Sequence, residues 1–157
     1  MSLDPVHAGE ALQATAGELH RIWRAARAQV RPRVFPGLAD DAAGRLLDRA
    51  ARALLEGALD TGDPYRELAA FVRLDPRHPD ASGAELDTEW RLLGEVLRAT
   101  CEALDAGDEA REFLARAVET AREGVTDLMG GRGPAGVVRV LQLSGFEPPR
   151  RRRDARP

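Results

Sequence analysis

Apolar residues follow a helical rhythm through residues 86–104, and this rhythm constrains the fold more than any other feature of the sequence. Side chains spaced three or four positions apart lie on one face of an α-helix. The apolar residues recur at intervals of four, three, four, four and three: Leu86, Trp90, Leu93, Leu97, Cys101 and Leu104. A helix with one apolar face must bury that face against other elements. The sequence therefore predicts a packed helical domain.

Four further segments show helical patterns, at residues 5–30, 40–59, 63–72 and 108–129. The first follows Asp4, a suitable N-cap residue, and has Pro5 at its first position. The helix that carries the apolar seam of residues 86–104, called the seam helix below, is expected to begin at Ser82, because Ser82 and Glu85 have the spacing of a capping box. Pro76 and Pro79 are expected to end the helix before it. The predicted fold is all-α, a single domain of five or six helices, globin-like or a helical bundle.

The end of the chain is less helical in pattern. Residues 135–143 fit either a short helix or a β-branched strand, and the helix is favoured because a lone strand would lack a partner. Residues 147–157 are rich in proline and arginine and indicate a flexible tail. We therefore expect a helical domain over residues 1–146 and a tail over residues 147–157.

Charge is divided unevenly along the 157 residues. The chain has a net charge of −3, but its last eight residues contribute +4, so the body is acidic. An acidic body argues against general binding of nucleic acid. The basic run in the tail indicates either a solubilising segment or an electrostatic contact; it consists of Arg150, Arg151, Arg152 and Arg153.

The residues that could carry catalysis or bind a metal show no spacing typical of an active site or a metal site. The three histidines lack metal-ligand spacing, and the acidic residues fall mostly on polar helix faces beside arginines, as in Glu18 with Arg21 and Glu112 with Arg116. The sequence thus predicts no catalytic residues, no metal and no cofactor. The single cysteine, the lack of a leader and the lack of a long apolar stretch favour a cytoplasmic protein without membrane contact.

The two tryptophans, Trp23 and Trp90, are expected to anchor the core. The alternative is that the seam helix forms a helix-to-helix interface with another molecule. The candidate interface residues are Trp90, Leu93 and Leu97.

The segment over residues 85–97, ELDTEWRLLGEVL, carries an acidic residue, an aromatic residue and an Arg-Leu-Leu run, Glu89 to Leu93. In this it resembles the non-haem globin-like N-terminal sensor domain of RsbR-type stressosome proteins and related sensor histidine kinases. The resemblance implies a globin-like fold, dimerisation through helices and a role in stress-response signalling without haem. Members of that family usually continue into an output domain, so a signal from this chain would leave through a partner of kinase, STAS or anti-sigma type.

The function expected from these observations is that of a non-enzymatic regulatory module that acts through protein–protein contacts as a homodimer. One alternative is a helical sensor that binds a small molecule or haem. Another is association with nucleic acid through the arginine tail.

Overall fold

The first two helices of the computed structural model, α1 (Pro5–Val30) and α2 (Asp40–Glu56), pack against each other. The structure describes residues 1–30, 39–73 and 79–130. The predicted N-cap is confirmed, since the Asp4 carboxylate accepts a hydrogen bond from the His7 backbone N–H at 2.9 Å. The predicted end of the second helix is too late. That helix stops at Glu56 because Gly57 adopts a left-handed conformation, with φ 70°, and its N–H donates to the Leu54 carbonyl.

The predicted helix at 63–72 has two parts. Only its first turn is α-helical, α3 (Asp63–Arg66), and it continues as a 3₁₀-helix, η1 (Glu67–Phe71). Both parts pack against the last helix, and η1 also contacts α2. This short element therefore braces the other helices.

The seam helix is α4 (Pro79–Ala103), and the last described helix is α5 (Asp108–Gly130). α4 begins three positions before the predicted start at Ser82. Pro79, which was expected to end the preceding helix, is its first residue, where the missing proline N–H removes no intrahelical hydrogen bond.

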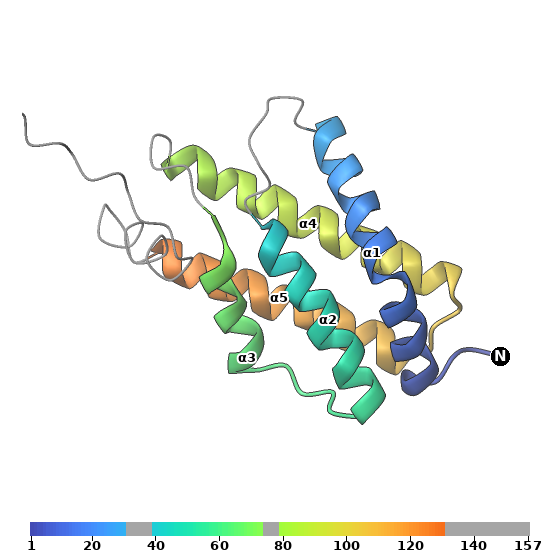
Figure 1. The fold of residues 1–157 in the computed structure, drawn as a ribbon. Coiled ribbons are helices and arrows are strands. Elements are labelled where there is room, and N and C mark those ends of the chain that lie inside the picture. The colour runs from blue at the N-terminus through green and yellow to red at the C-terminus, as the bar shows by residue number, and fades with distance from the viewer. Residues whose placement is uncertain (31–38, 74–78, 131–157) are drawn as a thin grey trace, which may run out of the picture.

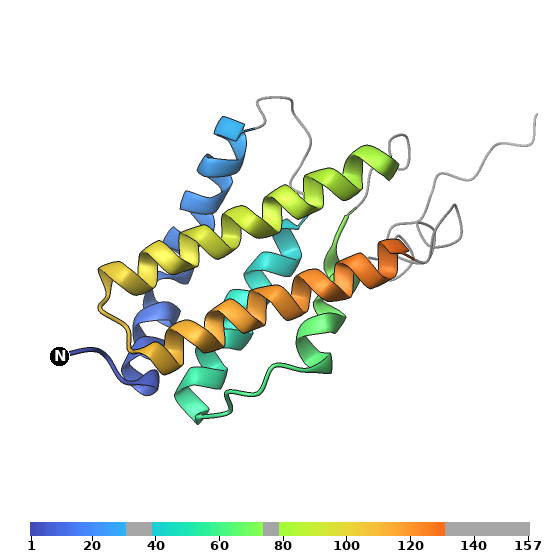
Figure 2. The same cartoon turned by 180° about the vertical axis from the view of Figure 1, so that it is seen from behind.

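The helices form two layers. α1 and α2 lie side by side, and α4 and α5 run antiparallel beside them (Figure 1). Seen from behind, α4 and α5 lie in front of the other helices (Figure 2). The all-α, single-domain prediction is confirmed for the described residues, whose only β-type pairing is an isolated bridge between Leu3 and Ala106. Residues 135–143 and the tail lie outside the described ranges.

The core lies between the two layers and is built around three large rings. Trp23, Trp90 and Phe113 are each at most 1% exposed. Tyr65 meets Phe113 edge to face, with ring centroids 6.1 Å apart. The core-anchor prediction for both tryptophans is thereby confirmed.

Two helix crossings are too close for a side chain. A Cβ placed on Gly124 of α5 would lie 2.4 Å from the Arg66 carbonyl oxygen of α3. One placed on Gly9 of α1 would lie 2.9 Å from the Leu54 Cβ of α2. Glycine at these positions lets the backbones approach. Among the described helices, none combines the length and apolarity needed to cross a membrane.

Candidate functional site: a groove between α4 and α5

The feature of greatest chemical interest is a partly open groove of about 270 Å³ between α4 and α5. It lies along the helix pair that faces the viewer in Figure 2. Every residue that lines it comes from these two helices: Trp90, Arg91, Gly94, Leu97, Arg98, Cys101, Glu102, Arg111, Leu114, Ala115, Val118, Glu119 and Arg122.

The floor of the groove is apolar. Leu97, Leu114 and Val118 contribute aliphatic side chains that are at most 6% exposed, and Trp90 closes one end. Gly94 leaves space there, since a Cβ at this position would make only an ordinary contact, 3.7 Å from Val118. An apolar floor of this kind can hold a hydrocarbon group away from water.

The rim of the groove is charged, and most of its charges are paired. Arg91 lies 2.9 Å from the Asp87 carboxylate, and Arg98 lies 2.7 Å from that of Glu102. Arg122 lies 2.6 Å from Asp87, and the resulting hydrogen bond raises the pKa of its guanidinium group.

Arg111 is the exception on the rim. Its Nε donates to the Ala106 carbonyl oxygen at 2.6 Å, which fixes the guanidinium at one end of the groove. Among the described residues, no carboxylate lies within 4.0 Å of it. Arg111 lies near the start of α5, whose first turn also carries the acidic residues Asp108 and Glu109. Arg111 is therefore the lining arginine whose charge has no ion-pair partner among the described residues.

Cys101 is buried at the same end, with 5% of its surface exposed. Burial raises the pKa of its thiol, and the Arg111 guanidinium opposes that rise only in part. The thiol is therefore protonated at neutral pH and is a poor nucleophile. Since it is the only cysteine of the chain, it is a specific chemical reporter for this end of the groove.

A second polar cluster lies deeper, where α1, α2 and α4 meet. Glu89 of α4 is 5% exposed, and its carboxylate accepts a hydrogen bond from the Ala39 N–H at 2.7 Å. Its other oxygen lies 3.5 Å from Arg27 of α1, which lies 3.6 Å from Asp40. Trp23 donates its indole N–H to the Glu89 carbonyl oxygen at 3.0 Å. The cluster thus ties the start of α2 to both neighbouring helices.

The burial of Glu89 corrects the expectation that the acidic residues lie on solvated faces. The spacing contained the signal, because Glu89 lies three positions after Leu86 and four before Leu93, on the apolar seam itself. His20 borders the cluster, with its ring stacked on Trp23 and its Nε2 3.3 Å from Asp40. Its side chain is 23% exposed.

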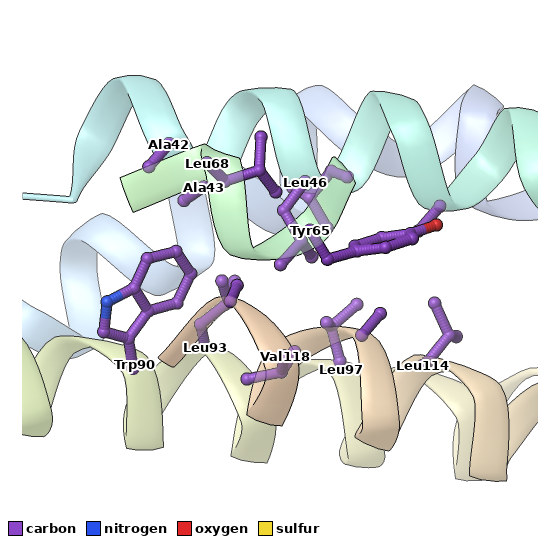
Figure 3. Close-up of a cluster of buried hydrophobic side chains, with 14 of the residues drawn as sticks. Ala42, Ala43, Leu46, Tyr65, Leu68, Trp90, Leu93, Leu97, Leu114 and Val118 are labelled. Carbon is purple, nitrogen blue, oxygen red and sulfur yellow. The ribbon is translucent and has the colours of Figure 1, made fainter. Parts of the chain in front are cut away.

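The candidate interface residues of the seam lie inside the domain. Trp90, Leu93 and Leu97 are 1%, 0% and 2% exposed. Figure 3 shows Trp90 and Leu93 pointing from α4 toward the side chains of α2 and η1. All three side chains therefore belong to the core of the domain. Of the three, Trp90 and Leu97 also border the groove. Arg150, Arg151, Arg152 and Arg153 lie outside the described residues.

The expected pairs Glu18 with Arg21 and Glu112 with Arg116 are present. Within the described ranges, no three His, Cys, Asp or Glu side chains are grouped to hold a metal ion. Comparison of the chain with protein-family models, with curated proteins and with solved structures finds no match.

Proposed function

We propose that this protein is a regulatory module that acts through protein–protein contacts, and that the outer face of α4 and α5 is its contact surface. The observation that carries the proposal is the groove, a partly open hollow with an apolar floor and a charged rim on the helix pair α4 and α5. The partner to which we commit is a second copy of the chain. Both points agree with the regulatory, dimeric role that the sequence resemblance implies.

The charges of this face permit self-association. The ion-paired side chains there consist of equal numbers of arginines and acids: Asp87, Arg91, Arg98, Glu102, Glu112, Arg116, Glu119 and Arg122. Because these charges sum to zero, a second copy approaching face to face meets no net repulsion from them. Arginines and carboxylates at the edges can also exchange partners across a twofold axis.

The face is also large enough. α5 has 23 residues and α4 has 25. At a rise of about 1.5 Å per residue and a width of about 10 Å per helix, the pair presents about 700 Å². A stable interface buries about 800 Å² on each partner, so the helix pair with its flanks suffices.

Sedimentation equilibrium over micromolar concentrations tests this proposal. We expect the wild-type chain to dimerise and Ala115→Arg, which places a charge beside the groove, to weaken association at least about tenfold. The matched control is Ala14→Arg, at an exposed alanine of α1, which should associate like the wild type. A wild-type chain that stays monomeric would contradict the proposal, as would a control as disruptive as Ala115→Arg.

The signal would pass from the module to a signalling protein of kinase, STAS or anti-sigma type. This step rests on the resemblance of residues 85–97 alone. Its test is a pairwise interaction assay with candidate proteins of these types, with Ala115→Arg and Ala14→Arg as the paired variants. If the signalling protein bound both variants equally well, its contact site would lie outside the α4–α5 face.

A second candidate function is that of a helical sensor for a small molecule. The groove favours it, since its volume of about 270 Å³ is close to the lower end of the range of small-ligand sites. A ligand there would lie beneath the proposed contact face. Ligand binding and protein contact would then be thermodynamically linked.

A further inference from the structure

We propose that the groove between α4 and α5 binds a small amphiphilic carboxylate, whose head group pairs with Arg111 and whose hydrocarbon tail lies on the apolar floor. This inference rests on the second candidate function, the small-molecule sensor. It adds the chemical class of the ligand and its orientation.

Volume selects a small ligand. The groove encloses about 270 Å³. A cavity of about 150 Å³ holds benzene, and sites for larger ligands begin near 300 Å³. A ligand of about ten to fifteen non-hydrogen atoms therefore fits, whereas a helix of a partner protein would not be enclosed.

The arginines that line the groove favour an anionic ligand and indicate where its head group binds. The groove is lined by four arginines, of which Arg91, Arg98 and Arg122 are paired with carboxylates. Arg111 has its Nε fixed by the Ala106 carbonyl oxygen and no carboxylate within 4.0 Å among the described residues. Its terminal amino groups are thus available to a ligand carboxylate, which matches the planar guanidinium.

The apolar floor of the groove favours a ligand with a hydrocarbon tail and indicates the direction in which that tail runs. From Arg111 the groove continues along Leu114 and Val118 of α5. Val118 lies seven positions after Arg111 on the helix, a distance of about 10 Å along the axis. A medium-chain fatty acid has both the length and the single terminal charge that this arrangement requires.

Isothermal titration calorimetry with decanoate, compared with 1-decanol, tests the head group. We expect saturable binding of one decanoate per chain, and binding at least about tenfold weaker in Arg111→Gln, as for loss of a hydrogen-bonded charge. Arg111→Lys should retain part of the affinity. The control Arg52→Gln, at an exposed arginine of α2, should bind like the wild type. 1-Decanol should bind the wild type and Arg111→Gln alike.

The floor is tested by a variant that fills it. Ala115→Trp should abolish decanoate binding, whereas Ala14→Trp on α1 should not change it. Bound decanoate should also slow the alkylation of Cys101 by iodoacetamide in the wild type, because the head group and the first carbons of the chain cover the Arg111 end of the groove, where Cys101 lies. Circular dichroism of each variant establishes that it is folded, and if Arg111→Gln is unfolded, Ala115→Trp and the Cys101 protection decide the question.

Three results would overturn the inference. They are the absence of saturable decanoate binding to the wild type, equal affinity in wild type and folded Arg111→Gln, and unchanged affinity in Ala115→Trp. None depends on the oligomeric state, so the inference can fail while the dimer proposal holds. Conversely, a strictly monomeric chain that binds decanoate would remove the dimer and leave the ligand site.

Discussion

A methyl group added at Gly124 tests how tightly α5 packs against α3. The added Cβ would lie 2.4 Å from the Arg66 carbonyl oxygen and 2.8 Å from its Cα. Ordinary contacts begin near 3.4 Å, so the two backbones would have to separate by about 1 Å. These atoms belong to the main chain, so a change of rotamer cannot relieve the overlap.

The net effect follows from two opposing contributions. Alanine is a better helix former than glycine by about 1 kcal/mol. Forcing an extra carbon into packed backbone costs about 1–3 kcal/mol and sometimes more. Because the Arg66 backbone must move as a unit, we place the cost at the upper end and expect Gly124→Ala to lose about 2 kcal/mol of unfolding free energy. For a chain of this size, the melting temperature should fall by about 6 °C.

A glycine series supplies the controls. Gly17→Ala, in the middle of α1 with nothing within 4 Å of its Cβ, should gain about 0.5–1 kcal/mol. Gly9→Ala, whose Cβ would lie 2.9 Å from Leu54 Cβ and 3.0 Å from the Ala51 carbonyl oxygen, should fall between the other two variants. Urea denaturation followed by circular dichroism measures all three. If Gly124→Ala proved as stable as Gly17→Ala, the close packing of α3 on α5 would be refuted.

Two further predictions concern the ends of α2 and α1. Glu89→Gln removes the buried charge that accepts the Ala39 N–H, and it should lower the unfolding free energy measured by urea denaturation by about 2 kcal/mol. The control Glu95→Gln, at an exposed residue of α4, should change it by no more than about 0.5 kcal/mol. Equal effects of the two variants would contradict the capping role of Glu89. At the start of α1, hydrogen bonds with His7 lower the pKa of Asp4, and the Asp4 carboxylate raises the pKa of His7. The contribution of Asp4 to folding stability is complete above about pH 4 and is lost as the pH falls through its lowered pKa. The contribution of His7 to folding stability is complete below about pH 6.5 and is lost as the pH rises through its raised pKa. His7→Ala should therefore differ most in stability from the wild type between about pH 4 and pH 6.5, and a difference that grows above pH 8 would contradict this assignment.

The sequence by itself determined the helices, because their signals are local. Spacings of three and four residues marked each apolar face, and a cap and a proline placed the start of α1. Intrahelical ion pairs such as Glu112 with Arg116 follow from the same spacing. The predicted boundaries were wrong where the conformation depended on one residue's own geometry, as at Gly57, or on where a proline could be accommodated, as at Pro79.

Only the tertiary structure decided which residues share a site. Glu89 lies on the seam, but its burial depends on a backbone N–H 50 positions earlier in the chain, at Ala39. The groove likewise depends on how α4 and α5 are rotated against each other. Their packing makes the small residues Gly94 and Ala115 line the same groove and leaves Arg111 without a carboxylate among the described residues. Periodicity gives the direction of each helix face. The space between two faces, and the charge left unbalanced at its rim, arise only when the helices pack.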